Sequence, residues 1–190
     1  PIARVTAKIA VGMTLDEIKI GNILAACEPA LDYVVTKMPR FPFDKFATAN
    51  NKLSTQMKAT GEVMAIGRTL EECLLKAIRS LEMGVCHLYN KKFDNYTVPQ
   101  LLDYIKEGTD DRIYAIAQLI RLGCDLGRVA HVTKIDMLFL EKFKNIVDFE
   151  KELKAKPFDL EVLRDAKRMG VSDEYIAQVW GSDEFELFKL

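Results

Sequence analysis

The spacing of apolar residues changes several times within the first third of the chain. Residues 2–11 place them at helical spacing, which predicts a helix that stops at Gly12. The T-x-x-E pattern from Thr14 to Glu17 is typical of a capping box and predicts a second, short helix. Residues 19–29 show no clear period, so we expect a loop there.

Two short segments further on are predicted to be strands. Residues 31–38 are rich in β-branched and aromatic side chains and lie between Pro29 and Pro39. Residues 60–67 are the second predicted strand, a short and mostly apolar segment with a glycine near each end, Gly61 and Gly67. An independently stable sheet usually needs at least three strands, so these two are too few to close a sheet by themselves.

Helical patterns dominate from Thr69 onward. Thr69 to Glu72 is another capping box, and the helix that it opens is expected to end near Gly84. Residues 85–96 form a polar and aromatic connector. Beyond it we expect helices at residues 97–108, 110–123 and 125–131, a long one from 136 to 157, and shorter ones at 159–170, 172–181 and from 182 onward.

These patterns together predict an α+β chain with a boundary near residue 85. Residues 1–84 mix helices and strands, and residues 85–190 are all-helical. The sequence leaves open whether the first part folds stably by itself.

The composition is that of a globular protein rather than a disordered one, because 49% of the residues are hydrophobic and 29% are charged. The net charge of −1 argues against a nucleic-acid partner, which usually meets a clear basic excess. No apolar run reaches the ~20 residues that a membrane span needs, so no membrane partner is expected. The chain begins without Met and without the layout of a signal peptide, which is typical of a fragment.

The sequence contains few residues that could form a metal or catalytic site. The cysteines are not spaced as C-x-x-C, and Cys86 beside His87 lacks further partners for zinc. Glu71 and Glu72 lie at the start of a predicted helix. A favourable interaction with the helix dipole explains two carboxylates there without a catalytic role. The phosphate-binding and nucleophile motifs are absent, so no catalytic, cofactor or metal residue is predicted. The cysteines and histidines are Cys27, Cys73, Cys86, Cys124, His87 and His131.

Glu62 is the one carboxylate inside the predicted strand at 60–67. Strand alternation would place its side chain in water. The other interpretation is a carboxylate that lines a pocket or passage. The pattern by itself favours the solvent-facing position.

An apolar triplet, Met137, Leu138 and Phe139, opens the long helix. These side chains belong either to the core or to a contact patch between copies of the chain. A different hypothesis is a free-standing helical module that binds other molecules, with residues 159–180 as a helix-turn-helix-like reader of nucleic acid. Acidic residues offset the basic ones in that stretch, which counts against the nucleic-acid hypothesis.

Several strings resemble one family, the large chains of glutamine-hydrolysing carbamoyl phosphate synthetase. The string EPALDYVVTKMPR at 28–40 is similar to the family's EPxxDYVVxKxPR, and QMKATGEVMAIGRT at 56–69 is similar to QMKxxGEVMAIGRT. The opening PIARVTAKIAVG, with TLDE after it, resembles the segment that follows the first ATP-binding site. The strings DRIYAIA at 111–117, TKIDxxFL at 133–140 and LxxAKxxGxSD at 163–173 resemble the family's helical domain.

The resemblance implies a particular position in the parent chain. Residues 1–84 would be the end of the carboxyphosphate-synthesising ATP-grasp domain, and residues 85–190 a truncated oligomerization domain. One departure is that the stretch between Ile18 and Glu28 is about four residues shorter than in the family. This difference concerns the path of residues 19–27 and not the family as a whole.

The resemblance also implies a function. The parent is a ligase that makes carbamoyl phosphate from bicarbonate, glutamine-derived ammonia and two ATP for arginine and pyrimidine synthesis. Its cofactors are ATP with Mg or Mn, and K. Its ATP and metal ligands lie before Pro1, so the fragment alone is expected to be inactive and to bind no ATP tightly. In the family, the glutamate of the GEVM string contributes to the tunnel that carries carbamate, a role that falls here on Glu62.

The same resemblance implies partners and a compartment. The partners are the remainder of the large chain, the small glutaminase subunit, and a second copy through the helical domain. The location is cytoplasmic, in keeping with scattered cysteines of a reducing compartment.

Overall fold

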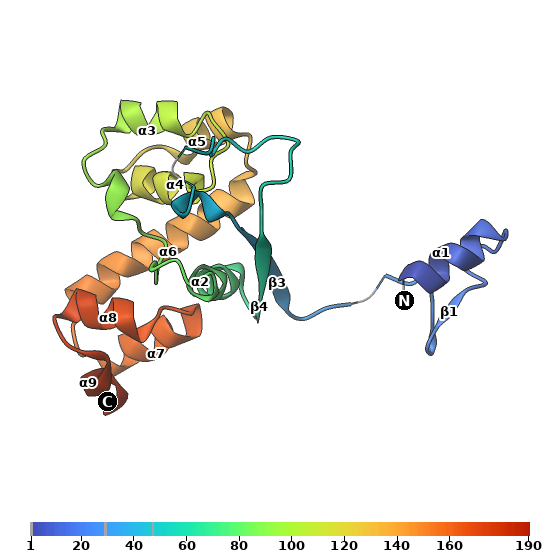
Figure 1. Cartoon of the computed structure of the whole chain (residues 1–190). Coiled ribbons are helices and arrows are strands. Elements are labelled where there is room, and N and C mark those ends of the chain that lie inside the picture. The colour runs from blue at the N-terminus through green and yellow to red at the C-terminus, as the bar shows by residue number, and fades with distance from the viewer. Residues whose placement is uncertain (1, 29, 47) are drawn as a thin grey trace. The chain divides into compact units, whose positions relative to one another are not determined.

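The computed structural model describes residues 2–28, 30–46 and 48–190, and the chain forms two compact units, residues 1–32 and 33–190 (Figure 1). The first unit has α1 (Ile2–Ala10) and a small antiparallel hairpin of β1 (Lys19–Ile20) and β2 (Ile23–Leu24). Helix α1 confirms the prediction for residues 2–11. Ile18 is the buried hydrophobic residue of this unit among those that the structure describes.

Two predictions for the first unit were wrong. The Glu17 carboxylate accepts hydrogen bonds from the Thr14 backbone nitrogen at 2.9 Å and from the Thr14 hydroxyl at 3.1 Å, which is one half of a capping box, but only a turn follows. The turn at residues 15–17 forms too few backbone hydrogen bonds to offset the free-energy cost of helix nucleation, and its residues are exposed, so no packing stabilises it further. The expected loop at 19–29 contains the β1–β2 hairpin, whose two-residue strands are too short to show an alternating pattern.

The second unit begins with a two-stranded antiparallel ribbon. Strands β3 (Val34–Arg40) and β4 (Gly61–Gly67) pair in a register that runs from Val34 opposite Gly67 to Arg40 opposite Gly61. The prediction of two strands is confirmed. The expected end of β3 before Pro39 was wrong, because both strands of a two-stranded ribbon are edges, and an edge tolerates proline.

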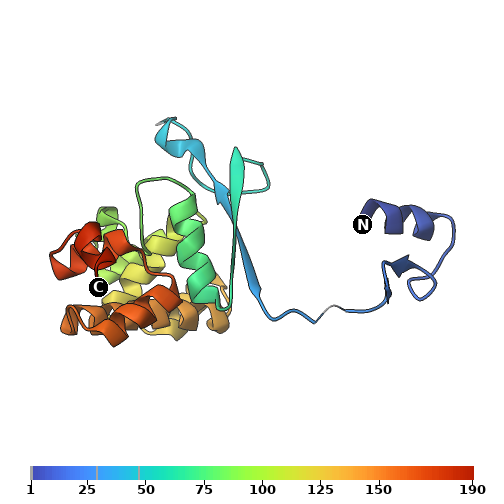
Figure 2. The same cartoon turned by 90° about the horizontal axis from the view of Figure 1, so that it is seen from below.

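The rest of the second unit is helical. Helix α2 (Leu70–Ser80) lies against the ribbon and joins it to the helical bundle, as both views show (Figures 1 and 2). After it come α3 (Val98–Tyr104), α4 (Arg112–Arg121), α5 (Leu126–Thr133), α6 (Met137–Ala155), α7 (Leu160–Met169), α8 (Asp173–Trp180) and α9 (Glu184–Phe188). Single 3₁₀ turns lie at Pro42–Asp44 and Lys91–Phe93.

The caps that the sequence predicts are present at most helix ends. The Thr69 hydroxyl accepts a hydrogen bond from the Glu72 backbone at 3.2 Å, and the Ser172 hydroxyl accepts one from Tyr175 at 3.1 Å. Gly170 ends α7 with a φ of +88°, a left-handed conformation that glycine adopts without strain. These local signals explain why the helices from Thr69 onward begin close to their predicted positions, although α2 and α3 end four residues before the predicted stops at Gly84 and Gly108.

Helix α6 is the centre of the core. It contacts α2, α4, α5, α7 and α8, and its buried side chains face inward. The connector at 85–96 also contributes to the core, because Leu88 and Phe93 are buried there. The expectation of a polar connector was therefore wrong in part. Its apolar residues are too few and irregular to show a period, and only packing against α3 and α4 buries them.

Candidate functional site

Glu62 lies near the start of β4, on the face of the ribbon that points away from α2. Its carboxylate forms an ion pair with Lys37 at 2.7 Å, and both side chains are exposed, at 59% and 58%. The solvent-facing position that alternation predicted is the one that the structure shows. An exposed pair of this kind contributes about 0–1 kcal/mol of stability, so the fold does not depend on it.

The face of the ribbon that carries Glu62 is mostly apolar. The register places Val35 opposite Ile66 and Lys37 opposite Met64, and the three apolar side chains are exposed. The opposite face, with Ala65 buried, packs against α2. Glu62 and Lys37 are therefore the charged groups at one end of an uncovered apolar strip.

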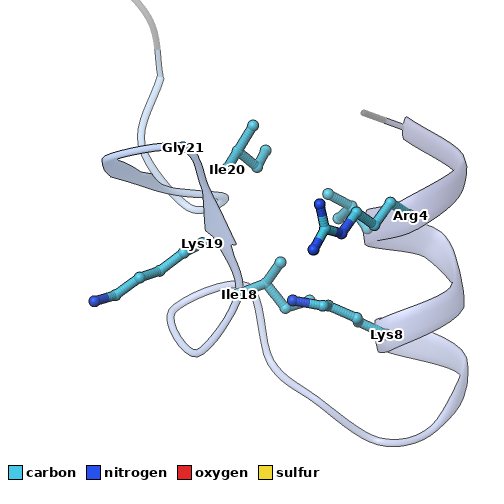
Figure 3. Close-up of a pocket in the computed structure, with 7 residues that line it drawn as sticks. Arg4, Lys8, Ile18, Lys19, Ile20 and Gly21 are labelled. Atoms are coloured by element: carbon cyan, nitrogen blue, oxygen red, sulfur yellow. The ribbon is translucent and has the colours of Figure 1, made fainter.

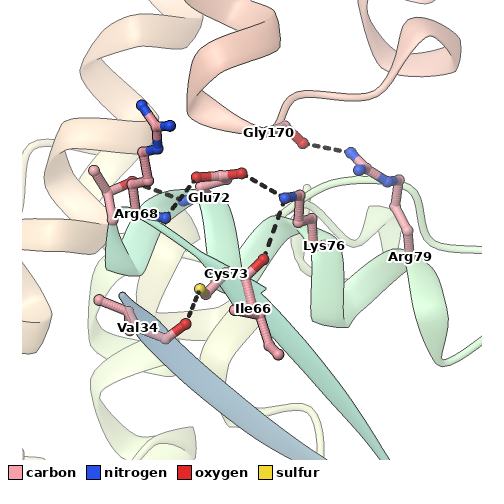
Figure 4. A network of polar contacts seen from close by, with 9 residues as sticks. Val34, Ile66, Arg68, Glu72, Cys73, Lys76, Arg79 and Gly170 are labelled. Carbon is pink, nitrogen blue, oxygen red and sulfur yellow. Dashed lines mark hydrogen bonds and ion pairs between the residues drawn. The ribbon is translucent and has the colours of Figure 1, made fainter. Parts of the chain in front are cut away.

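A network of polar contacts holds the ribbon on α2 (Figure 4). The Cys73 thiol donates a hydrogen bond to the Val34 carbonyl at 3.0 Å, and Lys76 Nζ donates one to the Ile66 carbonyl at 3.2 Å. Burial raises the pKa of the Cys73 thiol, so it stays protonated and able to donate. Cys73 thus binds β3 and Lys76 binds β4, so α2 holds both strands of the ribbon. This contact keeps the face that carries Glu62 directed away from α2.

Glu72 completes this network at the bend between β4 and α2. Its carboxylate pairs with Lys76 and accepts a hydrogen bond from the Arg68 backbone at 2.9 Å. The hydrogen bond from Lys76, with that from Arg68, lowers the pKa of Glu72. A Cβ at Gly67 would lie 2.8 Å from the Glu72 carboxyl group, so a larger residue there would displace this carboxylate from its contacts.

The other glutamate of the predicted helix start, Glu71, points into the protein. It is buried, accepts a hydrogen bond from Asn145 Nδ2 at 2.8 Å, and lies 3.4 Å from Lys142 Nζ. Burial alone would raise the pKa of Glu71, but the Asn145 hydrogen bond and Lys142 outweigh it and lower that pKa. Beyond any dipole interaction, Glu71 therefore connects α2 to α6.

The apolar triplet forms the first turn of α6. Met137, Leu138 and Phe139 are 38%, 56% and 46% exposed, whereas Leu140 is fully buried. The Asp136 carboxylate caps the helix by accepting from the Leu138 backbone at 2.8 Å. The triplet is thus an exposed patch rather than core, and the structure leaves it free for contact.

A buried ionic network at the centre of the bundle was missed by sequence reasoning. His87 Nε2 lies 3.0 Å from Glu150 Oε1, and Arg121 donates two hydrogen bonds to the same carboxylate, at 2.8 and 2.6 Å. The His87 ring stacks on Tyr175 with centroids 3.7 Å apart. The available signal was Glu150 itself, which lies on the buried stripe of α6 at helical spacing from Ile146 and Leu153.

The charges of this network follow from its surroundings. Burial lowers the pKa of His87 further than Glu150 raises it, so the imidazole is neutral at pH 7. Burial alone would raise the pKa of Glu150, but the hydrogen bonds from Arg121 and His87 lower it. The result is one carboxylate paired with one guanidinium, with His87 as a neutral donor through Nε2.

The first unit has a small recess of about 240 Å³ between α1 and the β1–β2 hairpin (Figure 3). Arg4 and Lys8, one turn apart on α1, extend toward the hairpin, whereas Lys19 points away. Ile18 and Ile20 form the apolar part of the wall. The lining is therefore cationic and apolar.

Neither a metal cluster nor a membrane span is found in the described ranges. No group of three or more His, Cys, Asp or Glu residues is placed to hold a metal ion within residues 2–28, 30–46 and 48–190. No helix in that part of the chain is both long enough and apolar enough to cross a bilayer.

The stretch at 159–180, considered as a reader of nucleic acid, has few free cations. Lys167 pairs with Asp173 and Arg168 pairs with Asp165, which neutralises two of its basic side chains.

The second unit is therefore a helical bundle with an exposed apolar turn at the start of α6 and a ribbon face that no described residue covers. The family model for the carbamoyl-phosphate synthetase large chain, oligomerisation domain, matches residues 62–190. The chain therefore belongs to the carbamoyl-phosphate synthetase large chain family. This match confirms the family that the sequence strings resemble, and the structure confirms the α+β fold with a mostly helical second part.

Proposed function

We propose that this chain is a structural part of the carbamoyl phosphate synthetase large subunit. In this proposal residues 85–190 join large chains to one another, and residues 1–84 end the ATP-grasp domain that makes carboxyphosphate. The family match over residues 62–190 is the observation that carries the proposal. The parent is a cytoplasmic ligase that uses ATP with Mg or Mn, and K, together with a glutaminase subunit. The fragment alone would be inactive.

The contact between copies would use the first turn of α6. Met137, Leu138 and Phe139 are large apolar side chains on consecutive exposed positions, which the core does not require to be apolar. Interface centres are rich in Met and aromatic residues and poor in charge. A two-fold contact would bring the same turn from each copy together.

We expect Phe139→Asp to convert an oligomer of the 190-residue chain into a monomer. A charge buried in a small apolar interface costs several kcal/mol, enough to raise the dissociation constant at least about a hundredfold. Light scattering coupled to size exclusion would measure the mass over a range of concentrations. Phe185→Asp, at an exposed phenylalanine of α9, is the matched control and should leave the mass unchanged. A wild-type chain that stays monomeric at the highest concentration would contradict the proposal.

The role of Glu62 is the second part of the proposal. Its carboxylate lies on the uncovered face of β4, where the remainder of the large chain could enclose it, and Lys37 orients it from the neighbouring strand. Enclosed in this way, the carboxylate would accept a hydrogen bond from carbamic acid as it passes to the second ATP site. The exposed position of Glu62 beside Lys37 supports a role in the wall of the passage rather than in catalysis.

We expect Glu62→Gln in the full-length synthetase to lower carbamoyl phosphate formation about tenfold, the loss of a hydrogen bond to a charged group. Bicarbonate-dependent ATP hydrolysis at the first site should continue, because the chemistry there is upstream of the passage. Coupled assays of the two rates measure the split. Glu161→Gln, at an exposed position of α7, should change neither rate. Equal loss of both rates would assign Glu62 to the fold or to the first site instead.

A further inference from the structure

The recess between α1 and the β1–β2 hairpin in the first unit is lined by basic and apolar side chains, and no acidic side chain of the described residues belongs to its lining (Figure 3). Its volume of about 240 Å³ is below the roughly 300–1,000 Å³ of sites for drug-sized molecules, so it fits only a small ligand. The basic lining residues are Arg4, Lys8 and Lys19, and the apolar ones are Val5, Ile18 and Ile20.

Two of these cations face the same space. Arg4 and Lys8 are one turn apart on α1, and both side chains extend toward the hairpin. Like charges at this spacing on a helix repel each other. Among the described residues, neither side chain forms an ion pair or a side-chain hydrogen bond. Helix α1 therefore directs two uncompensated positive charges into one recess.

The carboxylates of the first unit leave the recess positive. Glu17 is held by the Thr14 backbone nitrogen and hydroxyl, at 2.9 and 3.1 Å. The apolar part of the wall is formed by Ile18, which is 1% exposed, and by Ile20, which is 37% exposed. A ligand for this recess therefore combines a negative group with a small apolar body. The other carboxylates of the unit are exposed and lie outside the lining: Asp16, Glu28 and Asp32.

We propose that this recess binds a small phosphate monoester with an apolar organic group. The Arg4 guanidinium presents paired N–H donors that match two phosphate oxygens, and the Lys8 ammonium would donate to a third. A phosphate monoester carries a charge of about −1.5 to −2 at pH 7, which matches two cations better than the single charge of a carboxylate does. The organic group would lie against Ile18 and Ile20. The site lies within the first unit and uses neither Glu62 nor the first turn of α6, so it is independent of the proposed function.

The first test is a titration of the 190-residue chain with phenyl phosphate at pH 7 and low salt, followed by ¹⁵N chemical shifts and calorimetry. We expect millimolar or tighter binding, with the shifts concentrated at residues 4–8 and 18–21. Inorganic phosphate should bind more weakly because it lacks the apolar group, and phenylacetate because it carries a single charge. Added sodium chloride should weaken the binding of phenyl phosphate, since both cations are open to solvent.

Arg4→Gln should weaken the binding of phenyl phosphate about tenfold, the loss of hydrogen bonds from a charged group. Glutamine is a good helix former, so α1 should persist in this variant, as its ¹⁵N spectrum would show. Lys19→Gln is the matched control, because it removes one positive charge from the same unit while its side chain points away from the recess. It should change the affinity less than twofold. Absence of phenyl phosphate binding, shifts outside residues 2–24, or equal weakening by Arg4→Gln and Lys19→Gln would overturn the proposal.

Discussion

The substitution Glu150→Gln is expected to lower the free energy of unfolding by about 3–5 kcal/mol, the typical cost of breaking a buried ion pair from one side. Glu150 is buried, and its carboxylate holds both Arg121 and His87. Glutamine has one acceptor oxygen and no charge, so the guanidinium of Arg121 would stay half-buried without its counter-charge. Urea denaturation followed by circular dichroism would measure the loss.

Glu152→Gln is the matched control for this prediction. Glu152 lies two residues further on the same helix and pairs with Lys156 in an exposed i, i+4 contact. Such a contact contributes about 0.3–0.5 kcal/mol, so the same chemical change should have almost no effect. If the two variants lose the same stability, the buried network is not what holds α4 to α6.

The network also predicts a dependence of stability on pH. The folded pKa of His87 is lowered from its ordinary 6.5, so its contribution is complete above pH 6.5 and declines as the pH falls toward the folded value. Glu150, whose pKa is also lowered, adds a second loss below about pH 4.5. We therefore expect the wild type to lose stability from pH 7 to pH 5, and His87→Phe to flatten that part of the curve. A wild-type curve that rises over this range would contradict the neutral state assigned to His87.

The substitution Phe93→Ala is expected to cost about 3–5 kcal/mol, as for other buried aromatic residues cut back to alanine. The Phe93 ring is fully buried and meets Tyr96 and Tyr104 edge-on, with centroids 5.6 and 5.3 Å away. Each such aromatic pair contributes about 0.5–1.5 kcal/mol beyond burial of area. Removing the ring would therefore leave a cavity and end both contacts.

Thermal unfolding and urea denaturation would measure this effect against two other variants. Phe93→Leu keeps much of the apolar volume and should cost clearly less than Phe93→Ala. Phe188→Ala removes the same side chain from a residue that is 85% exposed, and should change stability by no more than about 0.5 kcal/mol. If Phe93→Ala resembled Phe188→Ala, the connector at 85–96 would not belong to the core.

The sequence predicted the helical part of the fold well because the signals there are local. Caps such as Thr69 and Ser172, and a stop such as Gly170, act through backbone groups only a few residues away. Apolar spacing over two or more turns then indicated the longer helices and the face that each of them buries. Shorter elements, such as the β1–β2 hairpin, contain too few residues for a period, and the division of the chain at residues 84 and 85 stays a prediction.

For the candidate site too, the sequence predicted only what neighbouring residues determine. Strand alternation predicted that Glu62 faces outward, and the run of three apolar residues at a helix start identified Met137, Leu138 and Phe139 as a possible contact patch. The sequence could not pair Lys37 with Glu62, since these residues are joined only by the register of two strands.

The amino-acid sequence by itself determined which family this chain belongs to, where most of its helices from Thr69 onward begin, and that it mixes strands with helices. Only the tertiary structure decided that Glu150, Arg121 and His87 form one buried network and that Lys37 pairs with Glu62 across two strands. Helix caps and apolar periods depend on neighbours in the chain, whereas an ion pair or a cavity depends on residues that packing brings together from distant positions.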